Sequence, residues 1–324
     1  MWGLRNDGRE QMGESLGLLW RTEQREVGVF RLLRPFEYLE PGSVSEAVDM
    51  LVRYGDKARI FAGGTDLVIS MKKRQMVPEY LIGISHLSEL DFIELEQDGT
   101  LRLGPLATHA RIAASPLVKQ RFPMLATACN EVGTPQVRNM GTIGGNVCKA
   151  GPSQDTPPVL VSLEAKLHMV GPAGKRTVPM DQFCTGPFCT VLAQDEVVVE
   201  IEVPPLPPRS AGCYKWITKI TSTDETLAGA GVVVVLKEDG SFEDVRIGLG
   251  SVAPMAIRAR RAESLLRGTW PEAAQIAEAA QIASEEAEPR SRAAYRRHMV
   301  KVLVNEGVTE MQRQVAASMQ EAGR

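Results

Sequence analysis

The sequence lacks several features that would place it in a simple functional class. No apolar stretch approaches the ~18 residues that a membrane helix needs, and the longest, residues 228–236, is typical of a buried strand. The formal net charge of −3 gives no indication of a nucleic-acid partner. The five cysteines are an odd number and cannot all form disulfide pairs within the chain, which argues against a secreted disulfide scaffold. These absences favour a cytoplasmic enzyme or enzyme subunit.

Common catalytic and cofactor signatures are missing as well. The sequence contains no Ser-His-Asp order, no HExxH, no Walker A motif and no GxGxxG after a predicted strand. The four histidines lie far apart, and none has metal-ligand spacing with another. No two cysteines form a CxxC pair, so an iron–sulfur cluster is not expected in this chain. We therefore predict no metal site here.

The length of the chain and its proline-rich run predict two or three domains. A chain of 324 residues exceeds the roughly 150 residues of one typical domain. Residues 1–29 are polar and carry no periodic apolar face, so we interpret them as a disordered tail, an arm that docks on a partner, or an early start codon. The proline-rich run 204–208 ends a first domain over residues 30–207. A second domain is expected over 211–310, with a tail over 311–324.

Apolar periodicity predicts the elements of the first domain. Residues 40–54 have helical spacing, with Ser43 as the N-cap and Glu46 as its capping-box partner. Residues 58–61 form a short buried strand that Gly63-Gly64 closes. Further patterns predict strands at 80–84, 166–170 and 196–203, a hairpin of 92–95 with 101–103, helices over 108–132, and a glycine-rich stretch over 141–152.

The second domain has a different order of elements. Three strands come first and three helices follow, which is the α+β pattern. The strands are expected at 213–218, 231–236 and 242–249, and the helices at 258–266, 272–285 and 291–305.

Two glycine pairs are the strongest functional signal. Gly63-Gly64 directly follows a predicted strand, and Gly144-Gly145 lies in the later glycine-rich stretch. Tandem glycines allow positive φ and close backbone approach, so that successive N–H groups converge on an anion. The hydroxyls of Thr65 and Thr142 add donors for phosphate oxygens. Two tight turns without a ligand are the alternative, but two such loops suit a diphosphate.

Side chains beside the second glycine pair extend this interpretation. Asn146 and Asp155 offer polar groups for the hydroxyl-bearing or heterocyclic parts of a ligand.

The order of the motifs along the chain resembles that of a known family. In the first domain the motifs are Ala62-Gly63-Gly64-Thr65-Asp66-Leu67, Pro135-Gln136-Val137-Arg138-Asn139, Gly141-Thr142-Ile143-Gly144-Gly145-Asn146 and Asp155-Thr156-Pro157-Pro158.

These motifs resemble the FAD-binding subunit of the molybdenum hydroxylases. That family includes the medium subunit of carbon monoxide dehydrogenase, the flavin subunits of bacterial xanthine dehydrogenases and the β subunit of 4-hydroxybenzoyl-CoA reductase. The likeness covers roughly residues 30–305. In the second domain it is carried by Ile247-Gly248-Leu249-Gly250-Ser251-Val252-Ala253-Pro254, Arg258, Ala262-Glu263 and Tyr295-Arg296-Arg297-His298.

The resemblance implies an α+β fold and an electron-transfer function. The FAD-binding domain would be of the vanillyl-alcohol-oxidase (PCMH) type with two subdomains, followed by a C-terminal domain with a three-stranded antiparallel sheet and helices. The FAD would relay electrons between two [2Fe–2S] clusters of a small subunit and an acceptor such as NAD, a quinone or ferredoxin. Substrate chemistry would occur on a large molybdopterin subunit, and such complexes pair into a dimer of heterotrimers. No catalytic residue is expected in this chain.

The resemblance also implies the residues that bind FAD. They form two walls around the diphosphate, with Asp155 on a polar part of the nucleotide, Val198 against the flavin, and Lys215 approaching it, although Lys219 competes for that role. The wall residues are Ile60, Phe61, Ala62, Gly63, Gly64, Thr65, Asp66 and Leu67 on one side, and Gly141, Thr142, Ile143, Gly144, Gly145 and Asn146 on the other.

Three departures from the family pattern leave alternatives open. Cys148 stands near the flavin where relatives often carry an aliphatic or small residue, and it either tunes the flavin or is a small apolar filler. The cysteine-rich loop of the 4-hydroxybenzoyl-CoA reductase subunit is missing. Lys219-Ile220 replaces a pair of arginines, which leaves flavin shielding and nicotinamide docking open. A stand-alone FAD oxidoreductase and a scaffold that has lost FAD are the other functional hypotheses.

Overall fold

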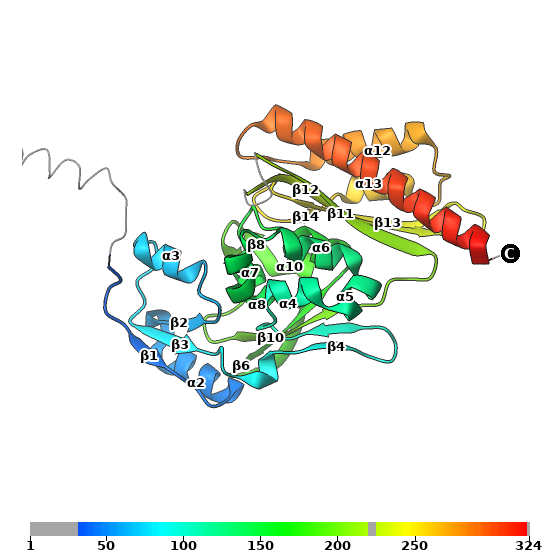
Figure 1. The fold of residues 1–324 in the computed structure, drawn as a ribbon. Coiled ribbons are helices and arrows are strands. Elements are labelled where there is room, and N and C mark those ends of the chain that lie inside the picture. Colours follow the sequence, from blue (N-terminus) through cyan, green and yellow to red (C-terminus); the bar gives the residue numbers. More distant parts are fainter. Residues whose placement is uncertain (1–31, 220–224, 323–324) are drawn as a thin grey trace, which may run out of the picture.

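The computed structural model describes residues 32–219 and 225–322, and its ribbon shows three consecutive units (Figure 1). The prediction for residues 1–29 lies outside this part. The first unit is a small parallel sheet of β1 (Glu37–Leu39), β3 (Tyr80–Gly83) and β2 (Ala58–Phe61), with β3 in the centre. Its helices are α2 (Val44–Tyr54) and α3 (Leu67–Lys72), with short 3-10 turns at Gly55–Lys57 and Ser88–Leu90.

The first helix confirms the predicted N-cap. Ser43 Oγ accepts a hydrogen bond from the Glu46 backbone N–H at 3.2 Å. The carboxylate of Glu46 accepts from the N–H of Gly42 at 2.6 Å, one residue earlier than a capping box would have it. Ala47, Val48 and Leu51 are buried on one face, because helical spacing places them in line over the small sheet.

The second unit is a five-stranded antiparallel sheet covered by helices. Its strand order is β4 (Ile93–Leu95), β5 (Leu101–Leu103), β10 (Val197–Val203), β6 (Lys166–Gly171) and β7 (Gly174–Pro179). The helices are α4 (His109–Ala114), α5 (Pro116–Arg121), α6 (Pro123–Glu131), α7 (Pro135–Met140), α8 (Ile143–Lys149), α9 (Thr156–Ser162) and α10 (Met180–Phe183). A two-stranded ribbon of β8 (Cys184–Gly186) and β9 (Cys189–Thr190) completes the unit.

Strand β10 contributes to the cores of both units. Val197 packs into the apolar cluster of the small sheet, whereas Val198, on the opposite face of the strand, packs into the cluster under the helices. The register of β10 against β6 shifts between Val198 and Glu200, and such bulges often lie beside functional sites. Both valines reach the cavity described below.

The third unit contains the three predicted antiparallel strands. They are β11 (Ser210–Thr218), β12 (Thr226–Leu236) and β13 (Phe242–Gly250), and a two-residue fourth strand, β14 (Ile257–Arg258), pairs with the edge of β13. The predicted buried strand at 228–236 lies within β12, the strand between β11 and β13. Helices α11 (Arg260–Leu266), α12 (Ala273–Glu286) and α13 (Ala293–Ala322) pack against this sheet (Figure 1).

Helix α13 extends beyond its predicted end. Residues 291–305 were expected to form this helix and 311–324 a tail, yet α13 continues to Ala322. Met311 and Val315 are buried in the apolar cluster of the third unit. Burial of these two side chains against the sheet stabilises the additional turns, which their mostly polar local sequence did not predict.

A buried ion pair fixes α11 to the sheet. Both guanidinium nitrogens Nε and Nη2 of Arg258 donate to the carboxylate of Glu263, at 2.5 and 2.8 Å. The same carboxylate accepts from the backbone N–H of Ile247 at 2.8 Å. The Arg258 and Glu263 side chains are only 5% and 2% exposed. Each charge is thus removed from water and depends on the other for compensation.

Candidate functional site

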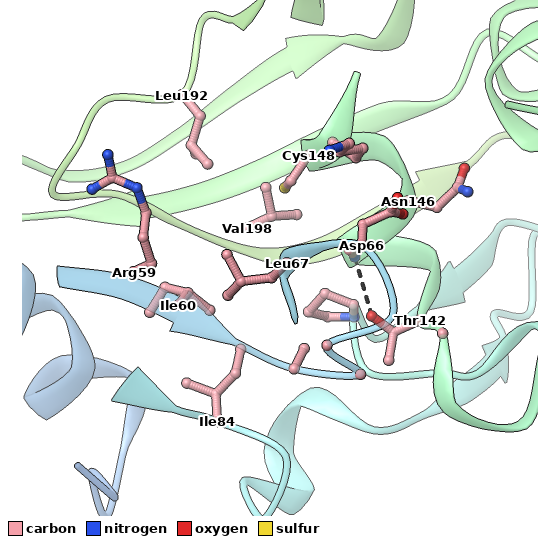
Figure 2. Close-up of a pocket in the computed structure, with 18 of the residues that line it drawn as sticks. Arg59, Ile60, Asp66, Leu67, Ile84, Thr142, Asn146, Cys148, Leu192 and Val198 are labelled. Atoms are coloured by element: carbon pink, nitrogen blue, oxygen red, sulfur yellow. Dashed lines mark hydrogen bonds between the residues drawn. The ribbon is translucent and has the colours of Figure 1, made fainter. Parts of the chain in front are cut away.

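A cavity of about 420 Å³ lies between the first two units (Figure 2). Its walls come from β2 and α3 on one side, and from α4, α8, β10 and the β8–β9 ribbon on the other. This volume falls in the range of small-molecule and cofactor sites. Most of the predicted wall residues line it, namely Ile60, Ala62, Gly63, Gly64, Thr65, Asp66, Leu67, Gly141, Thr142, Gly144, Gly145, Asn146, Cys148 and Val198.

The turn after β2 lines this cavity. Among the described residues, the N–H groups of residues 63–66 have no hydrogen-bond partner, although they precede a helix that begins at Leu67. Gly64 has φ of +71°, the left-handed conformation that turns successive amides toward one point. Successive N–H groups around such a residue are typical of an anion-binding nest. The first glycine pair therefore contains the positive φ that its sequence allows.

The structure brings the two glycine stretches into contact. A Cβ atom added to Gly63 would lie 1.9 Å from the carbonyl oxygen of Met140, the residue directly before the second stretch. No side chain fits at this point, because the two segments touch backbone to backbone. Residues 81 positions apart, Gly63 and Gly144, thus line one cavity.

The second glycine stretch is a helix rather than a loop. Thr142 caps α8, and its Oγ1 accepts from the N–H of Gly145 at 3.1 Å. The N–H groups of Ile143 and Gly144 donate to the carbonyls of Ala107 and Pro105, at 3.0 and 2.9 Å. These three amides, of Ile143, Gly144 and Gly145, are therefore used by the fold itself and are not free for an anion. Gly145 instead provides space, since its Cα is exposed to the cavity.

One part of the cavity is lined by apolar side chains. Ile60, Leu67, Leu192 and Val198 all line it together with Cys148 (Figure 2). Burial raises the pKa of the Cys148 thiol to about 12, and the nearby Cys184 adds to this effect. A thiol with this pKa is neutral at physiological pH. Its neutrality supports the interpretation of Cys148 as a small apolar filler.

Four predicted residues do not line the cavity. Phe61 packs edge-on against Tyr38, with ring centroids 6.0 Å apart, and Ile143 is fully buried in the core. Lys215 lies on β11 and its Nζ donates to Glu310 of α13 at 2.5 Å. The fourth, Asp155, is part of a separate buried network, and the competing Lys219 does not line the cavity either.

Asp155 joins the second unit to the third. Its Oδ1 accepts hydrogen bonds from Tyr214 Oη at 2.9 Å and from Thr226 Oγ1 at 2.6 Å. Tyr214 lies on β11 and Thr226 on β12. Asn146, which does line the cavity, is connected to this region because its Oδ1 accepts from Thr156 Oγ1 at 2.6 Å. The structure thus places Asp155 at the domain junction.

Substituting Asp155 by asparagine is expected to remove a pH dependence of stability. Burial raises the pKa of Asp155 to about 6, while the bonds from Thr226 and Tyr214 oppose the shift. Because the native state holds this proton more tightly, its contribution to stability is complete below about pH 4 and is lost as the pH rises to about 6. The variant should therefore gain up to about 3 kcal/mol relative to the parent across that interval. Urea unfolding at a series of pH values measures this difference, and parallel curves would contradict the assignment.

The cavity residues that the sequence analysis missed include His109, Lys149 and Phe188. His109 is buried, and its Nδ1 has no hydrogen-bond partner among the described atoms. Burial and then the charge of Arg138 lower the pKa of His109 to about 4, so the ring is neutral. An isolated histidine gives no spacing signal in a sequence. The sequence did contain a signal for Lys149, because this residue follows Gly145 by one helical turn and therefore lies on the same side of a helix.

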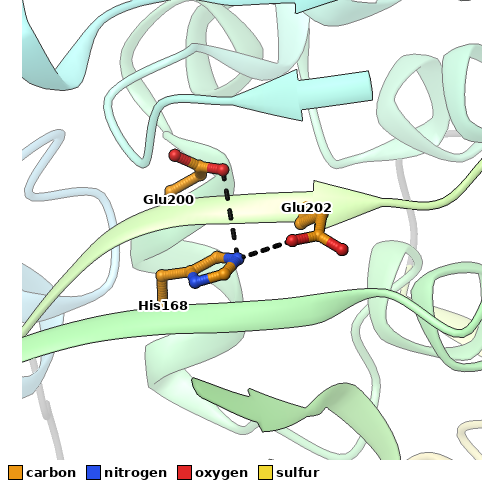
Figure 3. A group of neighbouring side chains, drawn as sticks. All are labelled: His168, Glu200 and Glu202. Atoms are coloured by element: carbon orange, nitrogen blue, oxygen red, sulfur yellow. Dashed lines mark hydrogen bonds and ion pairs between the residues drawn. The ribbon is translucent and has the colours of Figure 1, made fainter. Parts of the chain in front are cut away.

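A second cluster of polar side chains lies on the outer face of the large sheet (Figure 3). His168 of β6 faces Glu200 and Glu202 of β10, with its Nε2 2.9 Å from Glu202 and 4.0 Å from Glu200. Arg102 forms a two-bond ion pair with Glu200, and Lys166 pairs with Glu202 at 2.8 Å. Each carboxylate therefore already has a cation, and this network is electrostatically complete without a metal ion.

Comparisons with known proteins show matches along most of the chain. Residues 34–206 match the model of the FAD binding domain in molybdopterin dehydrogenase, and residues 214–311 match the CO dehydrogenase flavoprotein C-terminal domain. The carbon monoxide dehydrogenase medium chain of Hydrogenophaga pseudoflava is 39% identical over 251 residues, which are 76% of this chain and 86% of that protein. The glyceraldehyde dehydrogenase medium chain of Sulfolobus acidocaldarius is 32% identical and covers 85% of this chain and 98% of its own.

Solved structures show the same architecture. Carbon monoxide dehydrogenase from Hydrogenophaga pseudoflava superposes with a TM-score of 0.82 at 37% identity, covering 86% of this chain and 98% of that chain. Quinoline 2-oxidoreductase from Pseudomonas putida 86 gives 0.81 at 28% identity, covering 88% and 99%.

The matches define a two-domain flavoprotein of the oxidoreductase class. This chain belongs to the family of FAD-binding subunits of the molybdenum hydroxylases, which confirms the resemblance seen in the sequence. The predicted α+β fold is confirmed with it. Within residues 32–219 and 225–322, no helix has both the length and the apolar character needed to span a membrane.

Proposed function

We propose that this chain binds FAD in the 420 Å³ cavity and relays electrons for a molybdenum hydroxylase complex. The observation that carries the proposal is the row of unpartnered amides at residues 63–66, which faces that cavity. An N–H nest of this kind matches the diphosphate of a dinucleotide. The apolar residues around Val198 match the flavin ring. FAD, when bound, supplies the two-electron chemistry.

The roles of the chain's own residues follow from their positions. The amides of residues 63–66 orient the diphosphate, and Gly145 leaves room for it. Ile60, Leu67 and Val198 exclude water from the flavin. Cys148 and His109 are uncharged by virtue of their shifted pKa values, so neither adds charge to the wall. No residue of this chain needs to transfer a proton to substrate, because substrate is bound elsewhere.

The partners belong to the same proposal. A small subunit with two [2Fe–2S] clusters would exchange electrons with the FAD, and a large molybdopterin subunit would act on the organic substrate. The acceptor would be NAD, a quinone or ferredoxin, and the complex a cytoplasmic dimer of heterotrimers. Several relatives are medium chains or subunits of dehydrogenases, which supports this arrangement. Purification of the chain with such partners, identified by mass spectrometry, would separate it from a stand-alone FAD oxidoreductase.

The substitution Gly145→Leu tests the cavity directly. An added Cβ would approach only Thr142 Oγ1, at 3.1 Å, and the rest of the side chain would extend into the cavity. Because leucine also favours helix more than glycine does, we expect a folded protein that has lost FAD. The measurement is FAD released per chain, together with the flavin absorbance of the full-length protein.

A surface glycine provides the control. Gly42 is exposed, and an added Cβ there would be 3.4 Å from the Glu46 carboxylate. Gly42→Leu should therefore keep one FAD per chain. If Gly145→Leu also keeps one FAD per chain, the cofactor does not occupy this cavity and the proposal is wrong.

A further inference from the structure

Lys149 occupies a specific position relative to the amide nest. It follows Gly145 by four residues in α8, so both face the same side of the helix. Its Nζ donates to Ser70 Oγ on α3 at 3.3 Å. Ser70 lies one turn beyond Asp66, because its N–H donates to the Asp66 carbonyl at 3.0 Å. The ammonium group therefore bridges α8 and α3 one turn away from the nest.

The ammonium of Lys149 has only neutral contacts. These are the Ser70 hydroxyl and the Phe188 ring, whose centroid is 5.1 Å from Nζ. Among the described residues, no carboxylate pairs with it. An ammonium group without an anion at the wall of a cavity is available for a charge-assisted hydrogen bond to a negative ligand.

The other charged groups of the cavity do not compensate Lys149. Glu196 is engaged by Arg176 at 2.5 Å. The guanidinium of Arg59 donates to the carbonyls of Asp56 and Ala58. Asp66 has an exposed side chain at the start of α3 and pairs with no cation in the described part of the chain.

The ring of Phe188 is the second contact of the Lys149 ammonium group. It lies between β8 and β9 with φ of +61°, a conformation that is unfavourable for a bulky residue. Its backbone N–H donates to the carbonyl of Ala150 at 2.9 Å, and its side chain is 58% exposed. An exposed aromatic side chain in a strained conformation is a feature that function, more than packing, explains.

We propose that Lys149 supplies the counter-charge for the diphosphate of the bound dinucleotide, positioned by Ser70 and Phe188. This inference rests on the proposed function and adds a specific residue to it. The amides of residues 63–66 contribute partial charges, whereas the ammonium contributes a full positive charge. The flexible lysine stem spans the single helical turn between its present contacts and the nest.

The test compares Lys149→Met and Lys149→Arg in the full-length chain after its FAD has been removed. We measure the affinities for FAD and for ADP, which share the diphosphate, at low and at high salt. Lys149→Met should weaken both ligands by a similar factor of about ten, the effect of one charge-assisted hydrogen bond. Its affinities should also depend less on salt than those of the parent. Lys149→Arg should stay within about threefold, because it keeps the charge.

Controls separate this inference from the proposed function. Lys175→Met removes an exposed lysine of β7 and should leave both affinities unchanged. Lys149→Gln serves as a second neutral variant if Lys149→Met does not fold. Parental affinity in a folded neutral variant would overturn the inference but leave the FAD site intact. Weaker FAD binding with unchanged ADP binding would also overturn it, because the lysine would then act on the flavin half. Failure of the parent chain to bind FAD would instead overturn the proposed function.

Discussion

Glu263→Ala is expected to lower the free energy of unfolding by about 3–5 kcal/mol, because it removes the buried carboxylate that compensates the Arg258 guanidinium. The carboxylate of Glu263 is 2% exposed and accepts three hydrogen bonds, two from Arg258 and one from the Ile247 N–H. All three donors would lose their acceptor in the variant. Urea unfolding followed by circular dichroism measures the change.

The same arginine offers a matched control. Glu164 also pairs with Arg258, at 3.3 Å, but its side chain is 47% exposed. Solvent screens such a pair, so Glu164→Ala should cost less than about 1 kcal/mol. If the two glutamate variants are equally stable, the buried pair does not hold α11 on the sheet.

Gly63→Ala is expected to abolish FAD binding. The new Cβ would lie 1.9 Å from the Met140 carbonyl oxygen and 2.8 Å from its carbon, and backbone atoms cannot rotate away as a side chain can. The turn of residues 63–66 must therefore move relative to α7 and α8, and its amides would no longer converge on the cavity. Overpacking of this kind costs about 1–3 kcal/mol in stability, whereas we expect FAD to fall below detection.

The measurement is again FAD per chain, with the unfolding free energy determined on the same preparations. Gly42→Ala, on the surface, should match the parent in both quantities. A Gly63→Ala protein that holds one FAD per chain would show that the contact with Met140 does not shape the binding site.

Local sequence patterns were sufficient for elements whose burial is periodic. The helix over α2 was predicted because Ala47 and Leu51 recur at helical spacing after a serine cap. The strand β12 was predicted because a run of valines is buried on both faces. The turn at Gly64 was also predicted, since tandem glycines after a strand allow the positive φ that this residue adopts.

Tertiary contacts decided what happens at the second glycine stretch. Two adjacent glycines disfavour helix, and the sequence therefore indicated a loop. Contacts with Ala107 and Pro105, which lie some forty residues earlier, satisfy the first amides and make α8 possible. Thr142 caps this helix, because its hydroxyl oxygen accepts from the N–H of Gly145.

Long-range contacts also decided the positions of two residues that the family resemblance assigned to the FAD site. Asp155 was expected at the flavin nucleotide, but Tyr214 and Thr226 donate to its carboxylate from 59 and 71 residues further along the chain. Lys215 was expected to approach the flavin, but Glu310 pairs with it, on a helix that continues beyond its predicted end. Such pairings are long-range in sequence, so no local pattern reveals them.

The sequence by itself therefore determined the family, the order of the elements and the glycine turn that creates the amide nest, because these depend on neighbouring residues and on the succession of motifs. Only the tertiary structure decided that residues 63–66 supply free amides to the cavity, whereas Gly145 of α8 supplies space. It also decided that Lys149 lies one helical turn from these amides, with no carboxylate partner among the described residues. Both features depend on how α3, α8 and the β8–β9 ribbon pack together. These segments are far apart in the sequence, so the distances between them follow from packing and not from local sequence.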